Sequence, residues 1–90
     1  MTWSVSFSGE VVSFFRKARR LLEGDTLELV EKTIQMFNGE RVNVDVKKLK
    51  GEWVGFHRIR KGKLRIIVAF DFERHSVLIE RVDWRGGVYK

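Results

Sequence analysis

The chain has 90 residues, a formal net charge of +6 and no cysteine. This length fits one small domain spanning residues 1–90, and a hydrophobic fraction of 43% excludes a disordered chain. The lack of cysteine excludes disulfides and thiolate chemistry, and the lack of a long apolar segment predicts a cytoplasmic domain with no membrane partner.

The first predicted elements are a short strand and a helix. Apolar residues and serines alternate within residues 2–7, which predicts a half-buried strand. Apolar residues then recur at helical spacing from Val11 to Leu22, with Ser8 placed to cap this helix and Gly24 placed to end it. We therefore expect a strand followed directly by a helix.

A second helix is predicted from Asp25 to Gly39. Asp25 and Glu28 have the spacing of a capping box, in which two side chains satisfy the free amides at a helix start. The apolar residues that follow keep helical spacing as far as Gly39. Two helices joined by a tight Gly24-Asp25 turn form a helical hairpin, and its apolar faces need a sheet to cover.

The carboxyl-terminal half is predicted to contain a basic loop and three strands. The loop covers residues 42–51, and the strands cover 53–60, 64–71 and 77–83. Lys61-Gly62-Lys63 between the first two strands has the character of a hairpin turn. The order strand, helix, helix, strand, strand, strand predicts an α+β domain. In it, a two-helix hairpin packs on one face of a small twisted antiparallel sheet.

The positive charge is localised in this second half. Residues 1–39 contain five basic and five acidic side chains, whereas residues 40–90 contain the other 13 basic and 7 acidic ones. Eight basic residues lie from Lys47 to Arg65, and only Glu52 opposes them there. Such a concentration of basic residues is typical of a nucleic-acid-binding surface.

Strand alternation predicts which side chains share a face. Ile59 and Ile66 are expected in the core, which places Arg58, Arg60 and Arg65 on the face away from the helices. Guanidinium groups gathered on one face suit phosphate oxygens. The alternative is a solvated strand surface that only maintains solubility. The expected phosphate-binding residues are Arg58, Arg60, Lys47, Lys48, Lys50 and Lys63, although the loop lysines are equally compatible with simple solvation.

Three segments resemble the RelE/ParE superfamily of bacterial and archaeal toxins. They are Lys47–Gly51, Phe56–Ile67 and Arg81–Lys90, in the order and spacing of that family, and the likeness extends over nearly the whole chain. The family pattern is a Leu-Arg-hydrophobic-Gly-x-Tyr-Arg hairpin and a final Gly-His-Arg-x-x-Val-Tyr. The resemblance implies two helices on a small twisted sheet, the same fold as the alternation predicts.

The RelE-like branch of this family cuts messenger RNA in the ribosomal A site. The ribose 2′-OH attacks the phosphodiester and leaves a 2′,3′-cyclic phosphate and a 5′-OH. By position, the resemblance implies that Arg65 and Arg85 stabilise charge on the phosphorane. It implies that Arg58 and Arg60 hold the phosphate backbone, and that Tyr89 stacks on a base or orients an oxygen.

Two positions differ from the family pattern. The family commonly has lysine at one or both of the positions of Arg58 and Arg60, and often histidine at that of Trp84. Arginine does not titrate near neutral pH, so the sequence names no general base. No metal or cofactor is expected, because His57 and His75 match no metal-binding spacing.

The resemblance implies an acidic cognate antitoxin and messenger RNA on the ribosome as partners. One alternative is a ParE-like inhibitor that binds DNA gyrase and cuts nothing, since the fold alone does not fix the function. Another alternative is a catalytically weak relative that binds only RNA or antitoxin.

Overall fold

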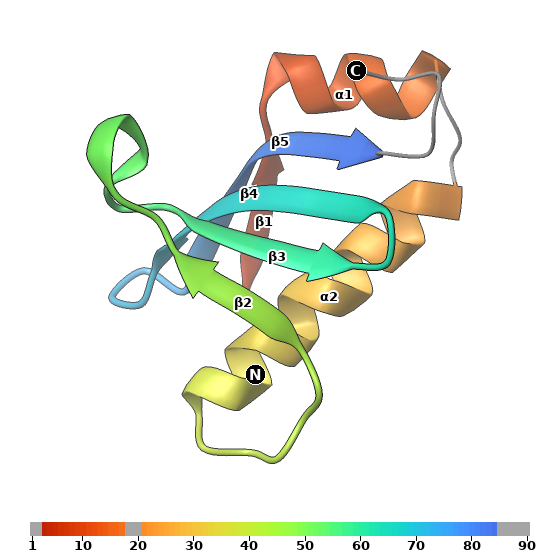
Figure 1. Cartoon of the computed structure of the whole chain (residues 1–90). Helices are drawn as coiled ribbons and strands as arrows, with labels where there is room; N and C mark the ends of the chain where they lie inside the picture. The colour runs from red at the N-terminus through yellow and green to blue at the C-terminus, as the bar shows by residue number, and fades with distance from the viewer. Residues whose placement is uncertain (1–2, 18–20, 85–90) are drawn as a thin grey trace.

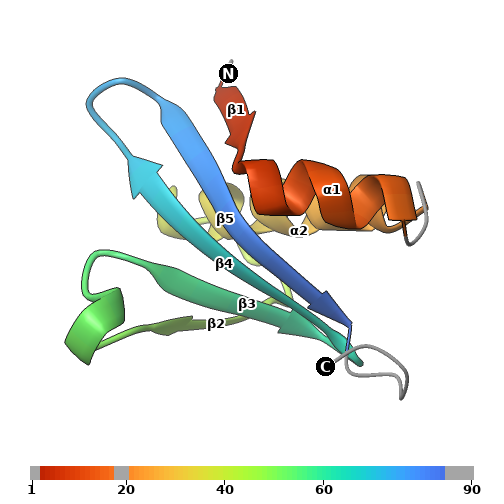
Figure 2. The ribbon, with the colours of Figure 1, turned by 90° about the horizontal axis from the view of Figure 1, so that it is seen from above.

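The computed structural model describes residues 3–17 and 21–84. A five-stranded sheet forms one layer, and the two α-helices cover one of its faces (Figures 1 and 2). In chain order the elements are β1 (Ser4–Phe7), α1 (Gly9–Lys17), α2 (Leu21–Phe37), β2 (Asp45–Lys48), the 3₁₀ turn η1 (Gly51–Trp53), β3 (His57–Lys61), β4 (Leu64–Asp71) and β5 (Ser76–Trp84). The predicted α+β class, with helices on one face of a sheet, is confirmed.

The strand order in the sheet is β1-β5-β4-β3-β2. The β5–β4 and β4–β3 pairs are antiparallel as predicted. β3 also pairs antiparallel with β2, a strand that was not predicted, and β1 pairs in parallel with β5, so the sheet is mixed. Alternation along a strand shows which side chains share a face, but it does not show which strand will be the neighbour. For this reason the sequence did not reveal the parallel pair.

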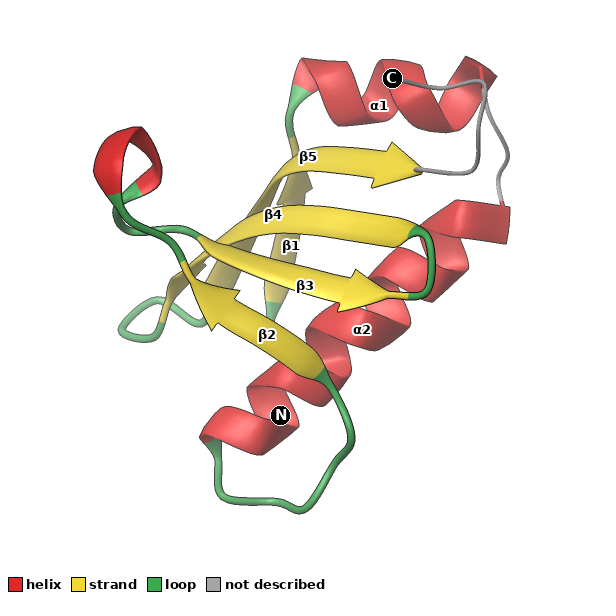
Figure 3. Ribbon diagram, in the orientation of Figure 1, coloured by secondary structure: helices red, strands yellow, loops and turns green. Residues whose placement is uncertain are grey.

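The core lies between this sheet and the helices, and α2 passes behind β3 in Figure 3. Ile59, Ile66, Val68 and Ile79 are completely buried in the centre of the sheet. The other buried apolar residues come from both helices and from the strands: Val11, Phe14, Phe15, Leu29, Val30, Ile34, Leu64, Val77 and Val82. Burial of apolar surface at roughly 25 cal/mol per Å² drives this packing.

The predicted turn at Gly24-Asp25 is wrong, because both residues lie inside α2. Thr26 lies in the same turn of the helix, and its hydroxyl donates to the Leu22 carbonyl at 2.6 Å. A glycine inside a helix costs about 1 kcal/mol, and the burial of Leu29 and other core residues of α2 outweighs it. The segment that joins α1 to α2 lies outside the described residues.

The predicted ends at Ser8 and Gly39 are confirmed. The Ser8 hydroxyl accepts a hydrogen bond from the Val11 amide at 3.2 Å, as an N-cap does. At the end of α2, Gly39 has a φ of +90°. The Glu40 amide there donates to the Gln35 carbonyl at 3.0 Å, which is a Schellman-type C-cap.

The predicted loop at residues 42–51 is partly wrong, because Asp45–Lys48 forms the edge strand β2. Val42, Val44 and Val46 alternate with polar residues, and this is the signal from which the strand could have been predicted. Conversely, residues 53–56 are not the start of β3. Trp53 is the last residue of η1, residues 54–56 form a turn in which Gly55 has a φ of +95°, and β3 begins at His57.

A bulge in β5 determines which side chains in the second half of this strand face the core. The register between β4 and β5 shifts between Ile67 and Val68, which leaves Glu80 without a residue opposite it. The Ser8 hydroxyl donates to the Glu80 carbonyl at 2.8 Å and so ties the start of α1 to the bulge. Beyond the bulge Val82 is buried in the core, and its two neighbours in β5 point to the opposite face.

Candidate functional site

The face of the sheet away from the helices, called the open face here, carries the predicted arginines. Arg58 and Arg60 of β3 and Arg65 of β4 alternate with the buried Ile59 and Ile66 and therefore lie on this face. Lys47 of β2 joins them, because it lies directly across from Arg58. The structure thus brings together four of the predicted phosphate-binding and catalytic residues.

These side chains form two rows that run across the strands. The first, the acid-flanked row, is Asp45, Arg60, Arg65 and Asp83, in which each residue lies directly opposite the next. The second, the basic row, is Lys47, Arg58, Ile67 and Arg81, paired in the same way. Side chains directly opposite one another have Cβ atoms about 4.5–5.5 Å apart, so charged neighbours within a row interact directly.

Asp45 binds two of the arginines. Its Oδ2 lies 3.0 Å from Nη2 of Arg60 and accepts a hydrogen bond from Arg60 Nε at 3.1 Å. Its Oδ1 lies 3.4 Å from Nη2 of Arg58. Because these groups are partly exposed, the ion pairs contribute only about 0–1 kcal/mol each. Their main effect is geometric, since one carboxylate holds two guanidinium groups side by side.

Arg58 is the more enclosed of the two arginines on β3. Only 22% of its side chain is exposed, and its Nε is buried with no hydrogen-bond acceptor among the described residues. An unsatisfied buried donor costs roughly 1–3 kcal/mol. The enclosed Arg58 side chain is held beside Asp45 on the open face.

Arg60 and Arg65 lie directly opposite each other at the centre of the acid-flanked row. Two like charges in this position destabilise a sheet, and here a carboxylate lies on the outer side of each one. The arrangement holds two guanidinium groups together in the free protein. A phosphodiester placed between them would meet positive charge from two strands at once.

Arg81 at the end of the basic row connects three elements. Its guanidinium lies 5.5 Å from the centroid of the Trp53 ring, and its Nε lies 3.5 Å from a carboxylate oxygen of Glu10 in α1. Trp53 also packs edge-on against Phe56 at 5.4 Å. Arg81 and Trp53 therefore anchor η1 beside the open face.

The other predicted residues do not lie in this group. Lys48 lies opposite His57 and points to the helix side of the sheet, so the three lysines of the predicted loop do not form one surface. Lys50 and Lys63 are exposed in turns at opposite ends of β3. Arg85 and Tyr89 lie outside the described residues. The sequence did not predict Asp45 as part of this group, because residues 42–51 were expected to form a loop and not a strand.

His57 lies on the helix side and does not reach the open face. Its ring packs against Phe37 at 5.6 Å and Phe70 at 5.8 Å. Burial lowers the pKa of His57 below its ordinary value of 6.5, and the nearby Lys48 lowers this pKa further. His57 is therefore uncharged at neutral pH and serves the packing of the domain.

Neither a metal site nor a membrane span is found in the described part of the chain. Within residues 3–17 and 21–84, no group of three histidine or carboxylate side chains is placed to hold a metal ion. Neither of the two described helices combines the length and the apolar character needed to cross a membrane.

Comparison with solved structures places this fold among known proteins. The RelBE2 toxin–antitoxin complex of Mycobacterium tuberculosis contains a chain that matches with a TM-score of 0.68 and 25% identity, over 94% of this chain and 100% of that one. A chain of the RelE–RelB complex of Pyrococcus horikoshii matches with a TM-score of 0.66 and 24% identity, over 98% and 100%. A chain of the YoeB–YefM complex of Staphylococcus aureus gives 0.66 and 17%, over 91% and 95%.

These matches confirm the resemblance predicted from the sequence. The chain has the fold of the RelE-like toxin superfamily. No protein-family model matches the chain, and no curated protein sequence matches it. The likeness to these toxins therefore rests on the three-dimensional arrangement together with the basic motifs.

Proposed function

We propose that this protein is the toxin of a type II toxin–antitoxin system and an endoribonuclease that cleaves messenger RNA in the ribosomal A site. The observation that carries the proposal is the convergence of Lys47, Arg58, Arg60 and Arg65 on one face of the sheet. Solved complexes with the same fold are described as toxin–antitoxin complexes, which supports the toxin role. The site of action is the cytoplasm, where ribosomes and messenger RNA are found.

The proposed chemistry is attack by the ribose 2′-OH on the adjacent phosphodiester. A bond forms from the 2′ oxygen to phosphorus and the bond from phosphorus to the 5′ oxygen breaks, which leaves a 2′,3′-cyclic phosphate and a 5′-OH. Arg58 and Arg60 hold the phosphate backbone so that the 2′-OH is in line with the bond that breaks. Arg65 stabilises the negative charge of the phosphorane, a role that Arg85 shares. Tyr89 stacks on a base or orients an oxygen.

Proton transfer in this mechanism falls to groups other than arginine. A general base has to accept a proton, and arginine remains protonated throughout. The carboxylates of the acid-flanked row, Asp45 and Asp83, flank the arginines there. Either of them, or a group of the ribosome itself, accepts the proton of the 2′-OH, and the leaving 5′ oxygen takes up a proton from water or from a group of the ribosome.

An acidic antitoxin is proposed as the neutralising partner. An acidic segment placed over the open face would pair with Arg58 and Arg60 in the way that Asp45 already does within the chain. Charge pairs at the rim of such a complex accelerate association and are weakened by salt. Covering this face would at the same time exclude RNA from the arginines.

The proposed activity is tested with purified protein and ribosomes that carry a defined message. The wild type is expected to cut the message in the A site, whereas Arg65→Ala is expected to lose at least about a hundredfold in rate, as when a charge-stabilising donor is removed. Arg74→Ala is the matched control, because Arg74 is an exposed arginine in the turn between β4 and β5.

Two outcomes would overturn the proposal. In one, the message stays intact while the protein blocks DNA supercoiling by gyrase, which would establish the gyrase inhibitor instead. In the other, the message is cut equally by the wild type and by Arg65→Ala, which would show that the open face is not the site.

A further inference from the structure

The open face has an apolar part beside its charged rows. Ile67 and Ala69 of β4 alternate with the buried Val68 and so point to the open face. Leu78 of β5 lies directly opposite Ala69. We call these three half-buried side chains the apolar shelf: Ile67, Ala69 and Leu78. The shelf begins in the basic row, at Ile67, and extends from there away from the acid-flanked row.

Two aromatic side chains from η1 and the turn after it form a wall beside the shelf. Trp53 packs edge-on against Phe56, with ring centroids 5.4 Å apart, and the Arg81 guanidinium lies 5.5 Å from the centroid of the Trp53 ring. Because Arg81 lies directly opposite Ile67, its contact with Trp53 brings the indole to the edge of the shelf. Figure 2 shows η1 on the side of the sheet away from the helices.

Packing of the core does not account for these aromatic residues. The partly buried apolar residues that pack against the core are Trp3, Phe7, Leu22, Val44, Val46 and Phe70. Within the described part of the chain, this group includes neither Trp53 nor Phe56. Large aromatic side chains contribute most to cores and to binding interfaces. An aromatic wall that is separate from the core therefore indicates a binding surface.

The charge beside the shelf favours a nucleobase as its occupant. Arg58 lies directly opposite Ile67, with Cβ atoms about 4.5–5.5 Å apart, so a phosphate held by Arg58 lies within one nucleotide of the shelf. Single-stranded RNA is bound by aromatic side chains on which its bases stack and by basic side chains that contact its phosphates. An apolar protein segment would cover the shelf but leave the arginines without a partner charge.

We propose that the apolar shelf binds one unpaired nucleobase of the message, stacked against Trp53, next to the phosphate that Arg58 holds. This inference deepens the proposed function and rests on it, because the message is the substrate proposed above. The indole N–H is the only hydrogen-bonding group among the side chains of the shelf and its wall. The base is therefore held by stacking, with little selection for its identity, and the nucleotide is fixed beside the arginines.

The test compares two RNA probes that carry the same phosphates. One is a single-stranded RNA of about six nucleotides, within the range that one small domain binds, and the other is the same chain with abasic riboses. Removal of the bases is expected to weaken binding to the wild type by roughly tenfold, as for the loss of one stacked base. The slope of log affinity against log salt should be the same for both probes, because it reports phosphate contacts.

An NMR titration of the wild type locates the bound base without any substitution. The complete RNA is expected to shift the indole N–H signal of Trp53, whereas the abasic probe is expected to leave this signal in place. Signals of Arg58 should shift with both probes, because both carry phosphates.

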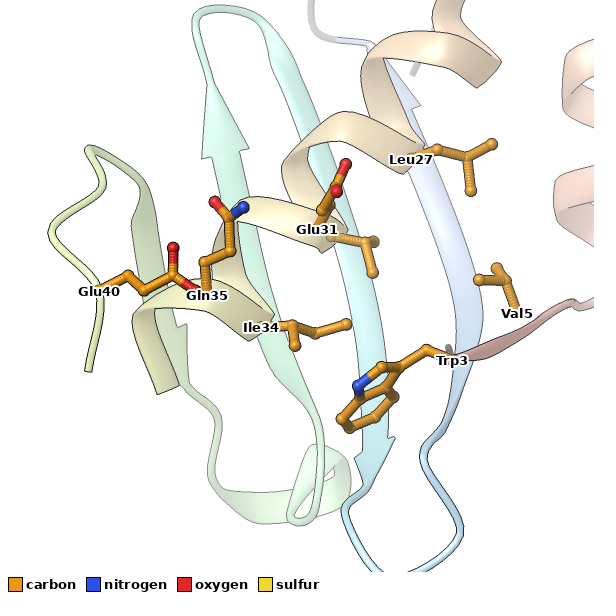
Figure 4. A pocket seen from close by; sticks show the side chains of 8 residues that line it. Trp3, Val5, Leu27, Glu31, Ile34, Gln35 and Glu40 are labelled. Carbon is orange, nitrogen blue, oxygen red and sulfur yellow. The ribbon is translucent and has the colours of Figure 1, made fainter. Parts of the chain in front are cut away.

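Matched variants make the test specific. Trp53→Ala is expected to weaken the complete RNA by roughly tenfold and to leave binding of the abasic probe unchanged. Trp53→Phe keeps an aromatic ring and should recover most of the affinity. Trp3→Ala is the control and should change neither probe, because Trp3 is also partly buried but lines a pocket between β1 and α2 (Figure 4). Thermal melts show whether each variant is folded.

Three results would overturn the inference. The first is an abasic probe that binds the wild type as tightly as the complete RNA. The second is an equal loss of affinity for both probes in folded Trp53→Ala. The third is a complete RNA that binds without shifting the Trp53 indole signal. These assays need no ribosome, so base-dependent binding at Trp53 without messenger cleavage would contradict the proposed function while supporting the shelf as an RNA-binding surface.

Discussion

Arg60 of β3 and Arg65 of β4 lie directly opposite each other, with Asp45 beside the first and Asp83 opposite the second. The pair concentrates positive charge at the centre of the open face, and the carboxylates at both ends limit its cost. Removal of a single carboxylate should therefore change the affinity of the open face for RNA.

Asp45→Asn is expected to tighten binding of single-stranded RNA, because it frees two guanidinium groups while keeping the shape of the side chain. The slope of log affinity against log salt should steepen by roughly 0.7 for each arginine that gains a phosphate contact. The free energy of unfolding should change by no more than about 2 kcal/mol, since each of the two partly exposed ion pairs contributes about 0–1 kcal/mol. Fluorescence titrations over a range of salt concentrations measure the slope.

The control for this variant is Glu73→Gln, which removes an exposed carboxylate in the turn between β4 and β5. Its salt slope should equal that of the wild type. If Asp45→Asn binds RNA with the wild-type affinity and slope, Asp45 does not restrain the arginines in the way described.

Two neighbouring isoleucines of β4 test which face of this strand lies in the core. Ile66 is completely buried, so Ile66→Ala is expected to lower the free energy of unfolding by about 2–5 kcal/mol. Ile67 lies in the basic row on the open face and is only half-buried, so Ile67→Ala should cost clearly less. Urea denaturation of both variants provides the comparison. Equal losses would contradict the assignment of faces on which the site depends.

His57 should make the fold less stable in mildly acidic solution. Its pKa in the folded protein is lowered, first by burial and then by Lys48, so the unfolded chain binds the proton more tightly. The free energy of unfolding therefore falls as the pH decreases through about 6.5, and this loss ends once the pH is below the folded pKa. Melting temperatures between about pH 7 and pH 5 measure the effect.

His57→Phe removes the titrating group and keeps an aromatic ring against Phe37 and Phe70. Its melting temperature should decline less than that of the wild type over the same pH range. A decline as steep as in the wild type would assign the pH dependence to other groups.

The contact between Arg81 and Trp53 is expected to stabilise the position of η1 by a small amount. A double-mutant cycle with Arg81→Ala and Trp53→Ala should give a coupling of about 0.5–1 kcal/mol, as for a partly exposed cation–π pair. Arg81→Ala with Phe56→Ala is a useful second cycle, because Phe56 contacts Trp53. Additive effects in the first cycle would show that the contact does not contribute.

Local patterns predicted the part of the site that lies within single strands. Alternation along residues 57–68 placed Arg58, Arg60 and Arg65 on one face, because a regular strand has a fixed period of two. The same logic would have found β2 from its alternating valines. The class of fold followed from the order of the elements.

The parts of the fold and of the site that local patterns did not predict depend on contacts between distant parts of the chain. The bulge at Glu80, tied to Ser8, places Arg81 and Asp83 on the open face, and no local pattern predicts it. The continuation of α2 through Gly24 reflects core packing that outweighs the preference of glycine for a helix end. The parallel pairing of β1 with β5 places Ser4–Phe7 beside Ser76–Ile79 and makes β1 an edge strand of the sheet.

The most direct test of the central claim is the cleavage of a defined message on ribosomes by the Arg60→Ala, Arg65→Ala double variant and by the wild type. The wild type is predicted to cut in the A site and to leave a 2′,3′-cyclic phosphate and a 5′-OH, and the double variant is predicted to leave the message intact while remaining folded. Wild-type cleavage by the folded double variant would contradict the claim that the open face carries the activity.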